Sequence, residues 1–135
     1  IRLIAASEKH LEITMLIIPG LNDNPGLFKK MIKWITDNCG PETVLHLSKY
    51  FPNYKSDKPV TPDMTLLEYY KIAKESIKYT YLGNTSIETG RDTYCPECGK
   101  KLIERSGYNI RFKNLDPEGH CRNCQTLVFK NITSS

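Results

Sequence analysis

The sequence lacks any long apolar run. Its apolar stretches end after four residues, as at residues 15–18, which are followed by Pro19, whereas a membrane-spanning helix needs about 20. The N-terminus shows no basic, apolar and small-residue leader, so we expect a cytoplasmic protein without a membrane partner. The first residue is Ile1 instead of Met, which predicts a processed product or a fragment of a longer chain.

An excess of one charge is lacking as well. The 19 basic and 15 acidic residues give a net charge of +4. Residues 1–91 and residues 92–135 each carry +2, and neither has the basic block that marks a nucleic-acid-binding arm. A nucleic-acid partner is therefore not expected. The apolar content of 39% and charged content of 25% are those of an ordinary globular protein, which excludes collagen-like, coiled-coil and wholly disordered chains.

Strand-like and helix-like patterns alternate over the first ninety residues. The pattern at residues 1–5 predicts the end of a helix. Asn24, as N-cap before Pro25, predicts a helix that closes at Gly40, with an apolar stripe from Leu27 to Ile35. Thr65 and Glu68 have the spacing of a capping box for a further helix, with its stripe at residues 66, 70, 73 and 77. Strands are predicted at residues 11–18, 43–48 and 78–82, the first of them buried on both faces.

This order of elements predicts a parallel sheet, because each strand is followed by a helix. A sheet of three parallel strands has two free edges and needs helices on both faces, but only two complete helices are present. We therefore interpret residues 1–84 as the late βα units of a partial TIM-type barrel, an α/β fold. A small open α/β domain completed by a partner chain is the alternative. Residues 85–93 are polar and predict a linker.

Four of the five cysteines form two pairs, Cys95-x-x-Cys98 and Cys121-x-x-Cys124, which are separated by 22 residues. This spacing lets all four sulfurs reach one ion and predicts a four-cysteine zinc ribbon, small and rich in β-structure, over residues 94–130. Short strands are expected at residues 101–105, 108–112 and 126–129, and residues 131–135 are expected to form a flexible tail. So small a unit has too little core to fold unaided, so the metal is expected to supply folding energy.

Zn(2+) is the expected ion, with iron of the rubredoxin type and a redox-active disulfide pair as the alternatives. Gln125 stands where the second pair would usually have a glycine, as Gly99 follows the first. Four thiolate ligands leave no open coordination position, so the metal is expected to be structural. His120 is interpreted as a solvated loop residue, and the unpaired Cys39 as a packing residue.

Other candidate site residues follow the predicted strands, where a βα barrel carries its ligands. Pro19, Gly20, Asn22 and Asp23 form a loop that either binds a ligand or only caps the next helix. His46 and Ser48 share one face of their strand, which in a barrel would face the cavity. A hydrogen-bonded structural histidine is the alternative for His46.

The segments 16–23 (LIIPGLND), 45–52 (LHLSKYFP), 81–84 (YLGN) and 94–99 (YCPECG), in this order, resemble a radical S-adenosylmethionine enzyme. More narrowly, they resemble the branch related to pyruvate formate-lyase activating enzyme, known as the AmmeMemoRadiSam-system radical SAM protein. The resemblance implies a barrel in which a [4Fe-4S] cluster cleaves S-adenosylmethionine reductively. It places Pro19, Gly20, Asn22 and Asp23 near the adenosyl group, and His46 and Ser48 toward an unknown substrate.

The cluster motif of that family, C-x3-C-x2-C, is absent from the sequence. The resemblance therefore implies the C-terminal portion of such an enzyme, whose S-adenosylmethionine and [4Fe-4S] cluster belong to the full-length parent. The chain alone is expected to be inactive, and its partner is the missing N-terminal part of the barrel. The alternative is a non-enzymatic zinc-ribbon module that binds protein or nucleic acid. Four basic residues could then meet phosphates, but four acidic residues dilute them: Arg105, Arg111, Lys113 and Arg122 against Glu97, Glu104, Asp116 and Glu118.

Overall fold

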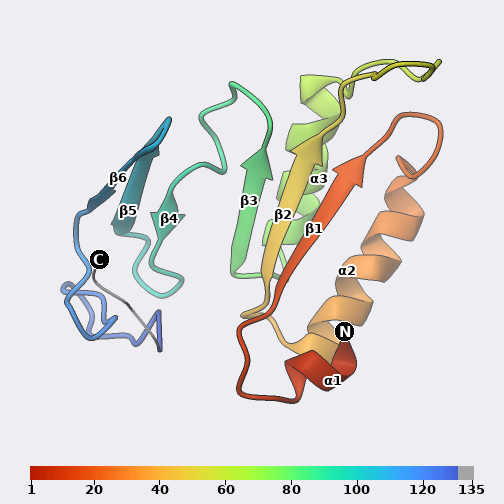
Figure 1. Cartoon of the computed structure of the whole chain (residues 1–135). Coiled ribbons are helices and arrows are strands. Elements are labelled where there is room, and N and C mark those ends of the chain that lie inside the picture. Colours follow the sequence, from red (N-terminus) through yellow and green to blue (C-terminus); the bar gives the residue numbers. More distant parts are fainter. Residues whose placement is uncertain (131–135) are drawn as a thin grey trace. The chain divides into compact units, whose positions relative to one another are not determined.

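A computed structural model describes residues 1–130, which divide into two compact units after Gly90. The boundary lies inside the segment 85–93 that was predicted to be a linker. The tail predicted at residues 131–135 lies outside the described residues. None of the helices described in residues 1–130 has the length and apolar character needed to cross a membrane. Figure 1 shows the elements of both units.

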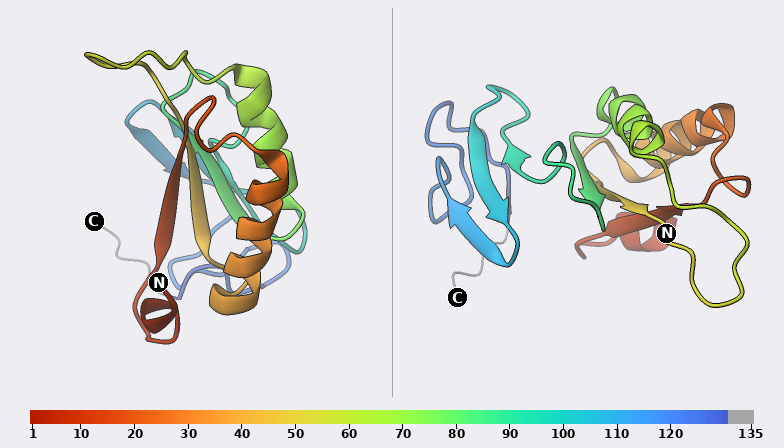
Figure 2. Two further views of the ribbon diagram at one scale, coloured as in Figure 1. Left: turned by 90° about the vertical axis from the view of Figure 1, so that its right-hand side faces the viewer. Right: turned by 90° about the horizontal axis from the view of Figure 1, so that it is seen from above.

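The first unit is a three-stranded parallel sheet with helices. Its strands are neighbours in the order β1-β2-β3, and the register pairs Thr14 with His46 and His46 with Tyr81. The two longer helices, α2 and α3, lie on the same face of this sheet (Figures 1 and 2). The elements are α1 (Arg2–Ala5), β1 (Glu12–Ile17), α2 (Pro25–Cys39), β2 (Val44–Lys49), α3 (Asp63–Lys74) and β3 (Tyr79–Gly83).

One apolar core fills the space between the helices and the sheet. The rings of Phe28 from α2 and Tyr69 from α3 stack with their centroids 4.4 Å apart. Alternate residues of each strand point to this side, so that the core takes every second residue of β1 and β2. The core residues from β1, β2, α2 and α3, together with Ile77 after α3, are Ile17, Leu45, Leu47, Phe28, Ile32, Ile35, Leu66, Tyr69, Ala73 and Ile77.

The helix α2 begins and ends as its sequence predicts. The side chain of Asn24 accepts a hydrogen bond from the backbone N–H of Leu27, Pro25 is the first helical residue, and Gly40 follows the last turn. The predicted apolar stripe is confirmed at Phe28 and at the two isoleucines of α2, but Leu27 is 63% exposed. Leu27 lies in the first turn, where it projects away from the sheet-facing side of α2.

The capping-box prediction for α3 is wrong. The helix begins at Asp63 after Pro62, and Thr65 lies inside its first turn. Pro62 has an extended backbone conformation, so the helix begins at the residue that follows it. The carboxylate of Asp63 accepts a hydrogen bond from the Lys49 ammonium at 2.6 Å, and an acidic residue in the first turn is favourable for the helix dipole. Tyr69, which the predicted stripe omits, is more deeply buried than Tyr70.

The prediction that the first strand is buried on both faces is also wrong. Exposed and partly buried residues alternate along β1, and only Ile17 is fully buried. Leu16, on the face opposite to the helices, is 42% exposed. The reason is that no described element of this unit covers that face. We call it the open face, and its residues on β1 to β3 are Glu12, Thr14, Leu16, Val44, His46, Ser48, Tyr79, Tyr81 and Gly83.

Two loops return to the sheet at the carboxyl ends of its strands. The long loop of residues 50–62 is tied down by Thr61, whose hydroxyl donates to the carbonyl of Ile17 and accepts from the N–H of Tyr50. Residues 85–90 fold back on β3, where the N–H of Leu82 donates to the carbonyl of Gly90. Two thirds of the predicted linker therefore belongs to the first unit.

The second unit is a small antiparallel sheet in the order β4-β5-β6, with β4 (Thr93–Tyr94), β5 (Lys101–Ser106) and β6 (Asn109–Phe112). β5 and β6 confirm the two predicted strands at residues 101–105 and 108–112. The strand predicted at residues 126–129 is wrong, since this segment makes only an isolated bridge between Leu127 and His120. The N–H groups of both Val128 and Phe129 donate to one carbonyl, that of Gly119, which is incompatible with a regular ladder.

The stacked pair in the core provides a test of the first unit. Phe28→Ala should lower the free energy of unfolding by about 3–5 kcal/mol, because it opens a cavity and removes the stacking with Tyr69. The adjacent control Leu27→Ala, at an exposed position, should change it by less than about 0.5 kcal/mol. Urea unfolding followed by fluorescence measures the first unit alone, because the single tryptophan, Trp34, lies in α2. Equal unfolding midpoints for the two variants would contradict this core.

Candidate functional site

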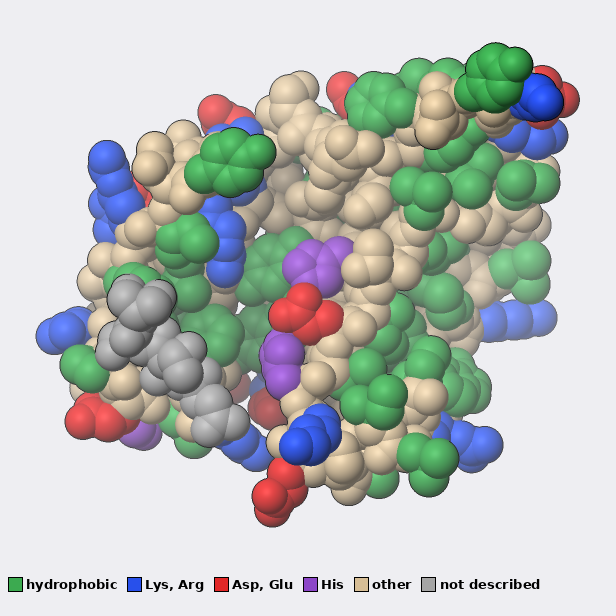
Figure 3. All heavy atoms as spheres, viewed as in Figure 1, with side chains coloured by type: hydrophobic (Ala, Val, Ile, Leu, Met, Phe, Trp, Pro, Cys, Tyr) green, Lys and Arg blue, Asp and Glu red, His purple; other side chains and the backbone are tan. Residues whose placement is uncertain are grey.

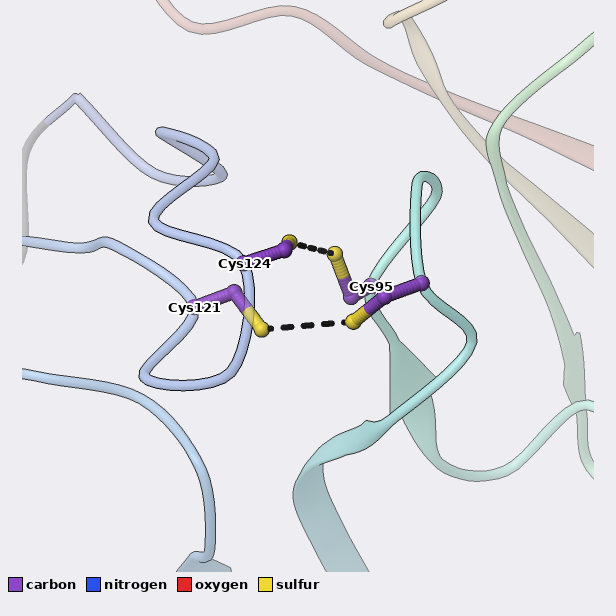
Figure 4. A group of neighbouring side chains, drawn as sticks. Cys95, Cys121 and Cys124 are labelled. Carbon is purple, nitrogen blue, oxygen red and sulfur yellow. Dashed lines mark hydrogen bonds between the residues drawn. The ribbon is translucent and has the colours of Figure 1, made fainter.

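The four paired cysteines converge on one point in the second unit. The Sγ atoms of Cys95 and Cys124 are 3.6 Å apart, and those of Cys98 and Cys121 are also 3.6 Å apart. Each close pair joins one sulfur from each Cys-x-x-Cys segment (Figure 4), and all four sulfurs lie within 4.8 Å of one another. The predicted metal ligands are thus brought together, while Cys39 lies elsewhere, against the core of the first unit.

The two Cys-x-x-Cys turns have the same backbone geometry. In the first turn, the N–H of Cys95 donates to the carbonyl of Lys100, and the N–H of Gly99 donates to the carbonyl of Cys95. In the second turn, Cys121 makes the corresponding bonds with Thr126 and Gln125. Gly99 and Gln125 therefore occupy equivalent positions. Both have a positive φ, +72° for Gly99 and +63° for Gln125, so the second turn places a glutamine where a glycine is unstrained.

The protein environment makes the four thiols unequal. Burial raises the pKa of Cys95 to about 12. The hydroxyl and backbone N–H of Thr126 stabilise the thiolate of Cys124 and lower its pKa to about 6. A backbone N–H from Lys100 lowers the pKa of Cys98 in the equivalent way. Cys124 is therefore ready to bind a cation at neutral pH, whereas a cation must displace a proton from Cys95.

This arrangement fits a tetrahedral metal ion. Four sulfurs at a Zn–S distance of about 2.3 Å would lie roughly 3.8 Å from each other, close to the 3.6 Å of the two pairs. The four cysteines can hold an ion such as zinc, and the same ligand set suits iron. Because every coordination position is filled by protein, the arrangement is that of a structural, zinc-ribbon-like centre.

A second group of possible ligands lies just before Cys121. Atoms of Asp116, Glu118 and His120 are within 4.8 Å of one another. However, one oxygen of Asp116 accepts hydrogen bonds from the N–H groups of Glu118 and His120, and the other lies 3.5 Å from the imidazole. These contacts describe a turn closed by its own aspartate. His120 thus helps to shape the loop that leads to Cys121.

The open face of the first unit carries the predicted cavity residues His46 and Ser48. The imidazole of His46 hydrogen-bonds to Glu12 at 2.9 Å, and a second histidine, His10, bonds to the other oxygen of the same carboxylate at 2.9 Å. Figure 3, viewed from this side, shows histidine and acidic side chains in contact. The ring of Tyr81 stacks on His46 at 5.5 Å. The two imidazoles lower the pKa of Glu12, His10 having the larger effect, so the carboxylate remains charged.

Ser48 lies nearer the carboxyl end of β2, opposite Gly83 of β3. A Cβ atom on Gly83 would approach the Ser48 hydroxyl oxygen to 3.0 Å, so the glycine leaves room above it. Among the described residues, this hydroxyl makes no hydrogen bond. His46 is thus engaged by a carboxylate at the amino-terminal half of the sheet, whereas Ser48 is available at the end where barrel enzymes bind ligands.

The polar side chains of the loop at residues 19–23 serve the loop itself. Asn22 accepts from the N–H of Ile18 and donates to the carbonyl of Leu16. Asp23 accepts from the N–H of Gly20. Both polar ends of Asn22 are therefore used, as in a structural turn. The four predicted ligand-binding residues, Pro19, Gly20, Asn22 and Asp23, lie together at the carboxyl end of β1, and their contact with a ligand stays a prediction.

The sequence interpretation missed Glu12, His10 and Thr126. Glu12 comes from the strand next to His46, 34 residues away in sequence, so only the strand register shows their contact. Thr126 could have been found, because it follows Cys124 by two residues, as Lys100 follows Cys98. The equivalence of the two turns then assigns to both residues an N–H donated to sulfur.

The metal centre should determine the folding of the second unit. Cys95→Ser and Cys121→Ser should each reduce bound zinc from about one ion per chain to well below that, because a three-thiolate site is incomplete. Cys39→Ser is the matched control and should retain the ion. Elemental analysis of the purified chains measures the stoichiometry. Removal of the ion by a chelator should abolish amide protection in residues 91–130 and leave the Trp34 fluorescence unchanged.

The second turn offers a test of the equivalence between Gly99 and Gln125. Gln125→Gly should tighten apparent zinc binding by roughly two- to fivefold. The substitution removes the strain of a non-glycine residue at positive φ, and the net gain in free energy is about 0.5–1 kcal/mol once the greater flexibility of unfolded glycine is subtracted. Gly99→Ala should weaken binding by a similar factor. Competition with a chromophoric chelator measures both. Weaker binding by Gln125→Gly would show that the hydrogen bond from its side chain to Arg122 matters more than the strain.

Comparisons with known proteins give a relative but no function. The chain is 43% identical over 117 residues to the uncharacterized protein MJ0808 of Methanocaldococcus jannaschii, and the match covers 84% of this chain and 35% of that protein. The chain therefore spans about a third of the length of the curated relative that it matches. No family model matches the chain, and no solved structure matches it.

Proposed function

We propose that residues 1–90 form consecutive βα units in the wall of a radical SAM-type barrel, with the zinc-ribbon-like unit as a structural appendage. The observation that carries this proposal is the position of α2 and α3 on the same face of a sheet whose strands follow each other in sequence order. One βαβαβ half of a doubly wound sheet has the same arrangement, and such a sheet differs from a barrel only beyond the point where its strand order reverses; the choice of the barrel therefore also depends on the sequence resemblance. In a barrel, neighbouring strands are consecutive and all helices lie outside.

Under this proposal the open face lines the cavity of the barrel. Its residues range from exposed on β1 to buried at Tyr79 on β3, and they include polar groups, with His46 and Ser48 at neighbouring inward positions of β2. The loops that follow the strands then form the mouth of the cavity. Thr61 holds the longest of them against the ends of β1 and β2, and the Asn84 amide donates to the carbonyl of Lys49. The mouth is thus built on fixed backbone positions.

Within this framework Ser48 is better placed than His46 to contact a substrate. Its hydroxyl lies near the carboxyl end of β2 beside the space left by Gly83, whereas His46 is paired with Glu12 and stacked on Tyr81. His46 would position the Glu12 carboxylate and shape the cavity floor. The residues at 19–23 would approach the adenosyl group through backbone atoms, since both polar ends of Asn22 are used inside the loop.

The [4Fe-4S] cluster of this enzyme class supplies the reductive cleavage of S-adenosylmethionine when it is bound. The residues of this chain do not fit it, because C-x3-C-x2-C is absent and four of the five cysteines share a closed site. The cluster ligands would therefore come from a preceding part of the parent protein. The larger size of the M. jannaschii relative leaves room for such a part.

The proposal is tested with the longest reading frame that encodes this chain, reconstituted anaerobically with iron and sulfide. Given S-adenosylmethionine and dithionite, it should form 5′-deoxyadenosine, whereas residues 1–135 treated in the same way should form none. Mass spectrometry quantifies the product. A longer protein that holds a cluster by absorbance and electron paramagnetic resonance but forms no 5′-deoxyadenosine would overturn the proposal.

A matched variant separates the two metal sites. Cys95→Ser in the longer protein should lower bound zinc and leave the spectrum of the iron–sulfur cluster unchanged, because this cysteine belongs to the second unit. Loss of the cluster signal in Cys95→Ser would mean that the four-cysteine centre itself holds the iron, and the proposed division of roles would then be wrong.

A further inference from the structure

The hairpin of β5 and β6 holds the whole net charge of the protein. Residues 100–113 contain five basic residues and one acidic residue, a net charge of +4, which equals that of the full chain. The remaining residues are therefore neutral as a group, and a bound zinc with four thiolates would make them negative by about two charges. A short hairpin with this excess of basic residues is complementary to a polyanion.

The acidic residues that dilute this charge in the sequence lie mostly outside the hairpin in the structure. Glu97 belongs to the first Cys-x-x-Cys turn, and Asp116 and Glu118 belong to the turn before Cys121. The single acidic residue of the hairpin, Glu104, pairs with Lys101 at 3.7 Å and with Lys113 at 3.3 Å. Asp92, just before β4, pairs with Lys101 at 2.8 Å and removes part of the hairpin's charge. Arg111 is exposed and forms no ion pair among residues 1–130.

The same hairpin presents a row of apolar and aromatic side chains. Tyr108 is fully exposed, Ile110 is 59% exposed and Phe112 is 61% exposed. They recur at every second position, so Ile110 and Phe112 share one face of β6, with Tyr108 preceding them at the turn. Isolated exposed apolar residues are normal, but a contiguous row on a small unit marks an interaction site.

β6 is also an edge strand, since within the described residues it pairs only with β5. Its free edge and its exposed rings are thus on one element. The hairpin turn is at the opposite end of β5 from the cysteine turn that precedes Lys101, roughly 17 Å away for six residues of strand. The metal centre therefore anchors one end of the hairpin and leaves the other end accessible.

We propose that this hairpin is a docking surface for a single-stranded nucleic acid, whose bases stack on Tyr108 and Phe112 and whose phosphates meet Arg111 and the neighbouring cations. Exposed rings interspersed with basic side chains are the combination that single strands require, because every base has a face for stacking and every nucleotide has a charge. The charge decides between partners, since a protein segment would need a run of acidic residues to match +4. This surface is independent of the proposed barrel function.

The test is fluorescence anisotropy of labelled dT12 and rU12 with the zinc-loaded chain. Both should bind, and a rise from 50 to 200 mM NaCl should weaken binding roughly 20-fold, as expected for about three phosphate contacts on a single strand. Tyr108→Ala and Phe112→Ala should each weaken binding about tenfold. Arg111→Gln should weaken it and reduce the salt dependence. Bound zinc of about one ion per chain shows that each variant retains its fold.

Tyr54→Ala is the matched control. Tyr54 is 87% exposed in the first unit and has Lys55 over its ring at 5.3 Å, so it offers the same chemistry at another place and should leave binding unchanged. The proposal would be overturned by absence of binding at 50 mM NaCl, or by equal losses in Tyr54→Ala and Tyr108→Ala. Equal affinity for a DNA duplex or for poly-glutamate would also overturn it, as would a dimer that Phe112→Ala dissociates.

Discussion

The covering of one sheet face by helices is the constraint on which the first unit depends. Parallel strands must be joined by crossover connections, which are right-handed. When successive strands are added along the same direction of the sheet, right-handed crossovers place every helix on the same face of the sheet. This places α2 and α3 together over Leu45 and Leu47, which are fully buried. It also leaves the alternate residues, among them His46 and Ser48, on a face that no described element of the unit covers. The division between core and candidate site thus follows from the handedness of the connections.

In the second unit, the cysteines are themselves part of a small hydrophobic core. Its core cluster has five buried members, and two of these, Cys95 and Cys121, are cysteines. The two Cys-x-x-Cys turns have the same set of backbone hydrogen bonds, so both cysteine pairs are presented by the same type of turn. Only glycine fits at position 119, because a Cβ atom there would lie 1.9 Å from the carbonyl oxygen of Phe129. This close backbone contact holds residues 126–129 in place, although they do not form a strand.

Most helices and strands could be predicted from local sequence patterns. Burial and side-chain contacts that depend on residues far apart in the sequence could not. The Asn24–Pro25 start of α2 and the spacing of the four cysteines are local signals, and the structure agrees with both. The predicted start of α3 comes too late in the chain because Pro62, not the spacing of Thr65 and Glu68, determines where the helix begins. The burial of β1 was overestimated because an apolar run does not reveal whether a second layer exists. The Glu12–His46 contact depends on the register of two strands, which no single segment encodes.

The four-cysteine site and the polar groups of the open face lie in different units of the chain. A closed four-thiolate site has no position for a substrate, so its contribution is mechanical: it fixes the end of β5 at Lys101 and thereby the orientation of the hairpin beyond it. Hydroxyl, imidazole and carboxylate groups lie on the open face instead, where partial burial still permits contact with a ligand. A rigid anchor beside an exposed basic hairpin reduces the entropy lost on binding. An ion held by the four cysteines would therefore fix the position of a hairpin that it does not contact.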